Sequence, residues 1–201
     1  REIVSFASSH GVEIVPSLDS PGHMNYAVKK YNEHYDKDIG NYFIKNGKRH
    51  IVSGSSTVKE DAALSASRGI DIANPEAVEF AKSLYTEYGA FFKELGCRKF
   101  DIGGDELLGW GALADPAYPK WQNLEVWDAL AKEKTKRDDA VAYDLFILYI
   151  NEIASLMRSI GYESVRIWND EVYLSSQTAW KGAATFDTSI DIQYWKQGAD
   201  I

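Results

Sequence analysis

Residues 100–110 read FDIGGDELLGW, and this stretch carries the sharpest local signal in the chain. Its first residues complete a predicted strand over 97–102, and the two glycines that follow permit tight backbone geometry. Two adjacent carboxylates, Asp105 and Glu106, come next. In barrels of parallel strands, the residues that follow each strand build the catalytic site. We therefore expect Asp105 and Glu106 to lie in a site at the carboxyl end of a strand.

The same unit recurs on both sides of this strand: a helical pattern, a glycine stop, a short apolar run and a polar loop. The predicted helices cover 1–9, 75–95 and a segment from Asp138 or Asp139 to 160, with a shorter unit at 174–183. The predicted strands cover 12–18, 97–102, 163–168 and 190–195. Strands that alternate with helices, without hairpin turns between them, imply parallel βα units.

Parallel βα units close either into an open doubly wound sheet or into an eight-stranded barrel of about 250 residues. The GxGxxG turn of the dinucleotide-binding fold is absent, which favours the barrel. Because 201 residues supply only four such strands, we predict a TIM (β/α)8 barrel of which this chain is a fragment holding about four central units. An irregular insertion near 31–69 interrupts the rhythm, and it is either a solvated excursion or small hairpin, or a wall of the substrate site.

Composition excludes several function classes. The chain has 22 Lys plus Arg against 30 Asp plus Glu, a formal charge of −8, which argues against a nucleic acid or an anionic membrane as partner. Its most apolar stretch, 140–157, is interrupted by polar residues, so no membrane insertion is expected. The single cysteine, Cys97, rules out an intrachain disulfide and a cysteine-based zinc cluster.

Three other predicted strands end in residues suited to a binding site. Asp19 and His23 follow the first strand, while Trp168 and Trp195 end the last two. The carboxyl ends of parallel strands meet at one edge, so these side chains should lie near Asp105. The adjacent carboxylates Asp105 and Glu106 cannot both ionise freely, so the pKa of one of them is expected to rise, which suits proton donation. Indole faces pack well on pyranose rings. The pattern predicts a carbohydrate substrate.

Other interpretations of these residues stay open at this point. The acidic pair could decorate a helix amino terminus, where carboxylates favour the helix dipole, and each tryptophan could belong to the core. A metal-dependent hydrolase is a different enzyme class that the same side chains allow. Its candidate ligands are Asp19, His23, Asp101 and Asp105.

Four segments together resemble a known family. They are HGVEIVPSLDSPGHM at 10–24, IDIANPEAVEFAKSLYTEYGAFFKELGCRKFDIGGDEL at 70–107, RIWNDE at 166–171 and IDIQYW at 190–195. They are similar to the catalytic barrel of β-N-acetylhexosaminidases of glycoside hydrolase family 20. The resemblance implies retaining, substrate-assisted catalysis, in which the substrate's own acetamido carbonyl attacks the anomeric carbon and forms an oxazolinium.

The resemblance also assigns roles by position. Glu106 would be the general acid and then the base, and Asp105 would orient the acetamido group and stabilise the positive charge. Trp168 and Trp195 match residues that enclose that group, and His23 matches a histidine near the acid. No cofactor and no metal are implied. The family's sugar-gripping arginine and its late-strand tyrosine and tryptophan have no counterpart here, so the chain alone is expected to lack part of the sugar-binding wall.

The function expected from the resemblance is release of terminal N-acetylhexosamine, GlcNAc or GalNAc, from glycans. Alternatives are a lacto-N-biosidase of the same family, a metal-dependent barrel hydrolase, and a non-catalytic glycan-binding barrel. Asn169 in RIWNDE is similar to the cell-surface enzymes of Gram-positive bacteria, which implies an extracellular or cell-surface location. Ser17 stands where many relatives carry an acidic residue, so hydrogen bonding around His23 is expected to differ.

Overall fold

The centre of the molecule is a four-stranded parallel sheet. The computed structural model describes residues 1–45, 47–53, 57–60, 67–105, 124–169, 172–174, 178–179 and 182–194. The strands are β1 (Ser17–Ser20), β5 (Lys99–Gly103), β6 (Ser164–Trp168) and β9 (Asp191–Gln193), in the order β1-β5-β6-β9. Each neighbouring pair is parallel, as the sequence predicts.

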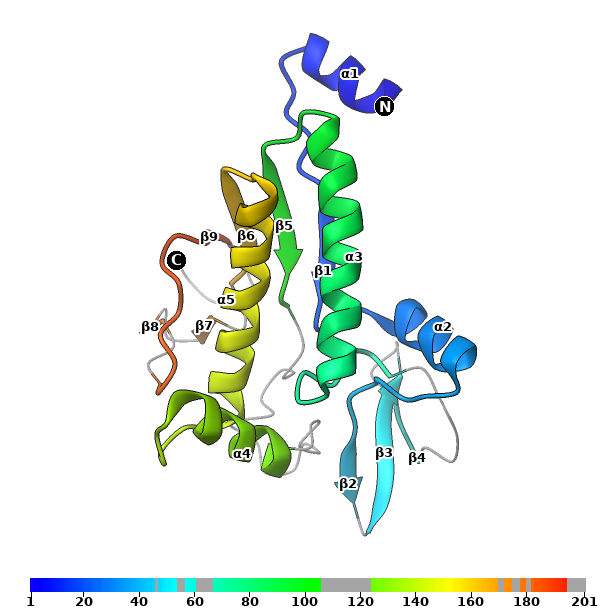
Figure 1. Cartoon of the computed structure of the whole chain (residues 1–201), viewed down its shortest axis with the longest axis vertical. Helices are drawn as coiled ribbons and strands as arrows, with labels where there is room; N and C mark the ends of the chain where they lie inside the picture. The colour runs from blue at the N-terminus through cyan, green and yellow to red at the C-terminus, as the bar shows by residue number, and fades with distance from the viewer. Residues whose placement is uncertain are drawn as a thin grey trace.

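Two long helices cover one face of this sheet (Figure 1). The helices of the chain are α1 (Glu2–Ser9), α2 (Asn25–Tyr35), α3 (Pro75–Glu94), α4 (Leu124–Thr135) and α5 (Ala142–Ile160). Helix α3 begins where the Asn74 side chain accepts a hydrogen bond from the Glu76 amide, with Pro75 at the first position. Helix α5 ends at Gly161, whose φ of 108° is left-handed.

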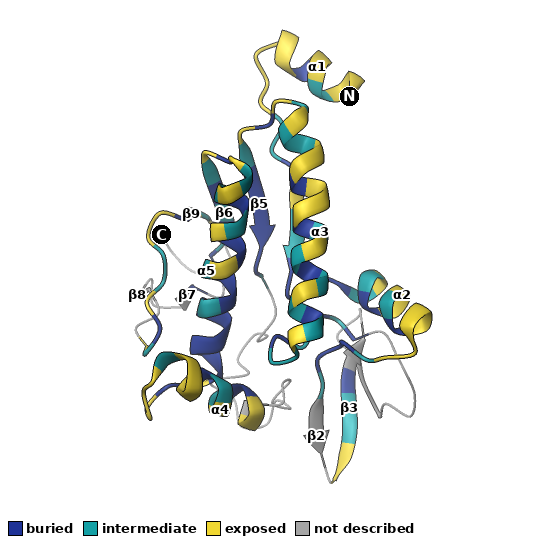
Figure 2. Ribbon diagram, in the orientation of Figure 1, coloured by how far each residue is buried: buried dark blue, intermediate teal, exposed yellow. Residues whose placement is uncertain are grey.

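The core lies between the sheet and these two helices. Strand residues alternate in direction, so Phe100 and Ile102 of β5 and Ile167 of β6 pack toward the helices and are buried. Asp101 lies in between, on the opposite face of the sheet. Figure 2 shows that buried residues mark the sheet-facing sides of α3 and α5, whereas α1 is mostly exposed. In β5 and β6, apolar side chains thus lie on the helix-facing side of the sheet, and a polar side chain, Asp101, lies on the other.

Two predicted boundaries are wrong. Strand β1 begins at Ser17 rather than at residue 12, because the Pro16 carbonyl still accepts from the Asp101 amide of β5 at 2.9 Å but proline has no N–H to extend the ladder, and residues 12–16 are assigned to no strand. Helix α5 begins at Ala142 rather than after a cap at Asp138 or Asp139. Its free amides are satisfied elsewhere: the Ala142 amide donates to Asp128 Oδ1 of α4 at 2.5 Å.

The predicted helical unit at 174–183 is also wrong. The described residues there form β7 (Tyr173–Leu174) and β8 (Thr178–Ala179), an antiparallel pair. The aromatic Tyr173 and the β-branched Thr178, which lie in these strands, favour an extended backbone. Conversely, α4 lies within 110–137, where the sequence patterns predict no element. Its Trp127 is fully buried, and the indole Nε1 donates to Asp71 Oδ1 at 2.7 Å.

The insertion near 31–69 contains a small antiparallel sheet of three strands. They are β2 (Phe43–Lys45), β3 (Lys48–Ser53) and β4 (Thr57–Glu60). This sheet lies at the carboxyl end of the central strands, and α1 lies beyond their amino end (Figure 1). The base of the insertion is closed by a bridge between Gly40 and Ile70 and by the Asn41 amide, which donates to the Gly69 carbonyl at 2.9 Å.

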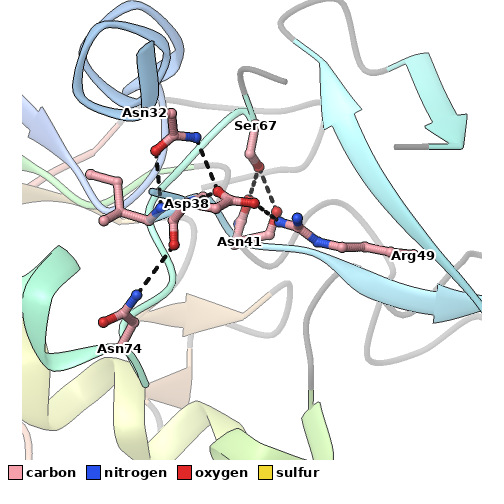
Figure 3. A network of polar contacts seen from close by, with 8 residues as sticks. Asn32, Asp38, Asn41, Arg49, Ser67 and Asn74 are labelled. Atoms are coloured by element: carbon pink, nitrogen blue, oxygen red, sulfur yellow. Dashed lines mark hydrogen bonds and ion pairs between the residues drawn. The ribbon is translucent and has the colours of Figure 1, made fainter. Parts of the chain in front are cut away.

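A polar network holds this base in place (Figure 3). Asp38 is its centre: it accepts from Asn32 Nδ2 at 3.0 Å, forms an ion pair with Arg49, and its carbonyl accepts from Asn74. Buried Ser67 donates to the Asn41 carbonyl at 2.7 Å. The network links α2, β3 and the start of α3, so the small sheet is fixed to the central unit.

Among the described residues, no helix combines the length and the apolar character needed to cross a membrane.

Candidate active site

Three predicted site residues come together at the carboxyl end of the sheet. Asp19 belongs to β1, His23 to the loop after it, and Asp105 follows β5 after one glycine, Gly104. A carboxylate oxygen of each aspartate and a ring nitrogen of His23 all lie within 4.8 Å of one another. The structure therefore shows, for these three side chains, the convergence that parallel strands imply.

Two glycines allow the aspartates to approach so closely. Gly103 has a φ of 71°, and a Cβ there would collide with the Asp19 side chain. Gly104 has a φ of 80°, and a Cβ there would lie 2.7 Å from the Ile167 side chain. The Gly104 amide donates to Asp19 Oδ1 at 3.1 Å. Only glycine meets both demands, a left-handed backbone and the lack of a side chain.

The two aspartates share a proton. Burial, and then the hydrogen bond and charge of Asp105, raise the pKa of Asp19 to about 9. Burial also acts to raise the pKa of Asp105, but hydrogen bonds from His23 and Asp19 outweigh it, so this pKa falls below its usual value. At neutral pH Asp19 is therefore the neutral donor and Asp105 the carboxylate.

His23 completes the group with unusual backbone geometry. Its φ of 53° is left-handed, and this conformation brings Nε2 to 3.4 Å from Asp105 Oδ2. Arg68 Nη2 lies 3.2 Å from the same nitrogen. Asp105 Oδ1 is buried and has no hydrogen-bond partner within the described residues. One oxygen of Asp105 thus faces His23, and the other is buried with its hydrogen-bonding capacity unused among the described residues.

Asp101 lies one layer deeper than the other aspartates. It is buried, its Oδ1 accepts from the Gly103 amide at 2.8 Å, and burial raises its pKa against the opposing charge of Arg166. It holds the turn that precedes Asp105. Of the four candidate metal ligands, Asp101 is outside the group whose ligand atoms gather in the described part of the chain. The other three could approach one cation, but the proton on Asp19 competes with that use.

The remaining predicted site residues are placed only in part. Trp168 is half-buried at the carboxyl end of β6, paired in register with Gln193 of β9. Glu106 and Trp195 lie outside the described residues. Sequence reasoning missed Arg68, which reaches His23 because segment 67–70 pairs its backbone with the His23 loop. The Met24 amide donates to the Arg68 carbonyl at 2.9 Å.

Comparison with known proteins places this geometry in a family. Residues 1–200 match the catalytic domain of glycosyl hydrolase family 20. A lacto-N-biosidase of Bifidobacterium bifidum is 26% identical over 97% of this chain and 14% of its own length. The beta-hexosaminidase subunit A1 of Dictyostelium discoideum is 25% identical over 100% of this chain and 29% of its own length. The chain therefore spans less than a third of either relative.

A solved structure shows the same fold. The family 20 beta-N-acetylhexosaminidase of Streptomyces coelicolor A3(2) superposes with a TM-score of 0.52 at 17% identity, over 100% of this chain and 28% of its own. The predicted fold class, a TIM barrel, is confirmed, because the catalytic domain of the family has this fold. By the match over residues 1–200, the chain belongs to glycosyl hydrolase family 20 and to its catalytic domain.

Proposed function

We propose that the protein containing this chain is a retaining glycosidase that releases terminal N-acetylhexosamine, GlcNAc or GalNAc, from glycans. The observation that carries the proposal is the Asp105 carboxylate: one oxygen faces His23 at 3.4 Å, while the other is buried and unpartnered among the described residues. A substrate acetamido N–H matches that oxygen. The family membership supplies the reaction class in which such a carboxylate acts.

The first chemical step forms a ring within the substrate. The acetamido carbonyl oxygen bonds to the anomeric carbon, the glycosidic C–O bond breaks, and the leaving oxygen takes a proton from the general acid, which we assign to Glu106. The oxazolinium that results is positive, and Asp105 stabilises it because the carboxylate stays ionised. Water then attacks the anomeric carbon while Glu106 takes one of its protons, and the bond from that carbon to the acetamido oxygen breaks, which restores the acetamido group and gives net retention.

Asp19 and His23 act on the Asp105 carboxylate and not on the sugar directly. The neutral acid of Asp19 donates to Asp105 and avoids a second negative charge beside it. His23 faces Oδ2 of the same carboxylate at 3.4 Å. We further propose that Trp168 and Trp195 form the aromatic wall around the acetamido methyl group. An extracellular or cell-surface bacterial location is part of the proposal and is supported by the similarity of RIWNDE to Gram-positive surface enzymes.

The second candidate is a lacto-N-biosidase, favoured by the B. bifidum relative that covers 97% of this chain. The test is hydrolysis by the full-length protein of p-nitrophenyl GlcNAc and of the p-nitrophenyl lacto-N-biose conjugate. Preferential cleavage of the first supports the exo-hexosaminidase, and preferential cleavage of the second supports the biosidase. Binding of both without turnover would instead indicate a non-catalytic glycan-binding barrel.

The metal-dependent alternative is tested on the same protein. Dialysis against EDTA is expected to leave hydrolysis unchanged, and a thiazoline mimic of the oxazolinium is expected to inhibit it. Loss of activity that zinc or manganese restores would overturn the proposal in favour of metal ligation by Asp19, His23 and Asp105. Glu106→Gln is expected to abolish activity on substrates with poor leaving groups, and full activity of that variant would contradict its assignment as the acid.

A further inference from the structure

Strands β1 and β5 pair irregularly just before they deliver the two aspartates. Ser17 pairs with Asp101 and Ser20 pairs with Gly103, so three steps along β1 correspond to two along β5. Such a bulge interrupts the ladder and turns a side chain toward a new direction. Here the turned side chain is Asp19, which lies between the two pairs. Something other than the regular ladder must therefore hold the strand ends together.

The hydroxyl of Tyr85 bridges the two strands at this irregularity. Tyr85 is fully buried in α3, and its Oη lies 2.7 Å from the Leu18 carbonyl of β1 and 3.0 Å from the Ile102 carbonyl of β5. Leu18 immediately precedes Asp19, and Ile102 immediately precedes the Gly103-Gly104 turn. The contact thus lies on the helix-facing side of the sheet, directly behind the aspartate pair.

Two further hydroxyls fix the direction of the hydrogen bonds. Ser20 Oγ lies 2.7 Å from Tyr85 Oη and 2.8 Å from Tyr149 Oη of α5, and all three groups are buried. Carbonyl groups only accept, so the Tyr85 hydrogen goes to them. Ser20 must then donate to Tyr85, and Tyr149 must donate to Ser20. The chain of hydrogen bonds runs from α5 through β1 to α3 and ends on the carbonyls of both strands, with every donor used.

We propose that Tyr85 is a positioning residue of the candidate active site: its hydroxyl ties the ends of β1 and β5 together and sets the placement of Asp19 against Asp105. This inference rests on the proposed function, because it concerns the carboxylate that the reaction uses. Tyr85 does not contact that carboxylate; it acts through the backbone. A small displacement of a positioned group is sufficient to slow a reaction by one to two orders of magnitude.

The protein offers a matched control. Tyr162 is also buried, its hydroxyl donates to the Gly89 carbonyl at 2.7 Å, and its ring packs edge-on against Phe100, as the ring of Tyr85 does. Tyr162 precedes β6, so it lies at the amino end of the sheet, away from the aspartates. Tyr85→Phe and Tyr162→Phe therefore each remove a buried hydrogen bond from a tyrosine hydroxyl to a backbone carbonyl, at opposite ends of the sheet.

The experiment measures kcat and KM of the full-length protein and both variants on the hydrolysed p-nitrophenyl glycoside. Both variants are expected to lose stability, but only Tyr85→Phe should lower kcat, by about 10- to 100-fold with KM within about twofold. A kcat for Tyr85→Phe equal to that of Tyr162→Phe would overturn the inference. If Tyr85→Phe does not fold, Tyr149→Phe provides the test, because it removes the first donor of the chain of hydrogen bonds. A kcat loss below the 10- to 100-fold expected for Tyr85→Phe supports the positioning role. An unchanged kcat contradicts it.

A second readout does not depend on activity. Crystal structures of the wild-type protein and both variants are expected to show the Gly104 amide to Asp19 hydrogen bond, 3.1 Å here, lost in Tyr85→Phe and kept in Tyr162→Phe. An unchanged contact in Tyr85→Phe would refute positioning by this hydroxyl. If the wild-type protein cleaves no N-acetylhexosaminide, the proposed function fails, while these structures still decide the structural inference.

Discussion

The two ends of the parallel sheet use charge in opposite ways. At the carboxyl end, two largely buried acids of the same type lie together: the pKa of Asp19 is raised to about 9, so it stays neutral, and the pKa of Asp105 is lowered, so it is ionised. At the amino end, opposite charges pair near solvent: Lys99 Nζ lies 2.7 Å from Glu13, and Arg98 lies 3.4 Å from Glu163. The first arrangement is unfavourable unless a proton neutralises one group, and the second is satisfied without cost to either partner.

This difference in charge indicates which end of the sheet is sensitive to substitution and to pH. Ion pairs near water contribute about 0–1 kcal/mol each, so the amino end gains little from its charges and loses little when they are removed. Buried carboxylates shift their pKa values because desolvation and like charge act in the same direction. Only the carboxyl end is therefore expected to respond strongly to substitution and to pH, and four predictions test that asymmetry.

The largest effect is expected for Asp105. Replacing it by asparagine removes the charge that would stabilise the oxazolinium, and kcat of the full-length protein should fall by about 10²- to 10³-fold. Glu13→Gln at the amino end is the control and should leave kcat unchanged. Steady-state kinetics on p-nitrophenyl GlcNAc measures both. A comparable loss in the two variants would remove the functional difference between the ends.

The next effect concerns glycines with left-handed backbones. Gly103→Ala should lower the free energy of unfolding by about 3 kcal/mol, because left-handed strain adds to overlap with the Asp19 side chain. Gly96, at the amino end, has a φ of 90°, but a Cβ added there would meet no atom within 4 Å, so Gly96→Ala should cost only about 1–2 kcal/mol. Urea unfolding compares them, and equal losses would show that the aspartate contact is unimportant.

The third effect is a pH dependence. The pKa of Asp19 is raised to about 9, so its neutral form stabilises the fold fully below the unfolded pKa near 3.8, and that stabilisation is lost as pH rises through about 9. Asp19→Asn keeps a neutral side chain and cannot ionise. Between pH 5 and 9, the free energy of unfolding of this variant should fall less steeply with pH than that of the wild type. The two slopes should differ by up to about 1.4 kcal/mol per pH unit.

Glu13→Gln serves as the control for this titration. The pKa of Glu13 is lowered, chiefly by its hydrogen bond with Lys99, so its contribution is lost only as pH falls below the ordinary range. The slope between pH 5 and 9 should match the wild type. Parallel slopes for Asp19→Asn and the wild type would show that Asp19 is ionised across this range, against the shared-proton interpretation.

The smallest effect is expected for the surface ion pair itself. Lys99→Gln should change the free energy of unfolding by no more than about 1 kcal/mol, and added salt should reduce the difference further. Thermal unfolding at low and high salt measures this. A loss well above that figure, insensitive to salt, would mean that the amino end carries more of the stability than its exposure implies.

Local signals explain which parts of the fold were predictable. Asn74 and Pro75 mark the start of α3 by their own chemistry, and Gly161 marks the end of α5, so both boundaries follow from neighbouring residues. The start of α5 does not, because the Ala142 amide is satisfied by Asp128 of another helix. Asp144 does accept from the Val141 amide three residues before it, but the contact from Asp128 could not be predicted from the residues beside the boundary.

The candidate site also has features that the sequence predicts and features that it does not. Parallel strands alone imply that Asp19, His23 and Asp105 meet, and the structure brings them together. The approach of Arg68 depends on pairing between two loops, and the proton position depends on burial, neither of which composition or spacing encodes. The roles of Glu106 and Trp195 stay predictions, because both residues lie outside the described part of the chain.

The closed base of the 31–69 insertion has a consequence for changes in its length. Because Gly40 bridges Ile70 and the Asn41 amide bonds the Gly69 carbonyl, both ends of the segment are fastened before it leaves the central unit. Changing the length of such a closed loop costs little free energy. We therefore expect changes in length between residues 42 and 66 to cost little stability if the ion pair between Arg49 and Asp38 is kept, because the pairing of Arg68 and Ile70 with the His23 loop does not depend on them.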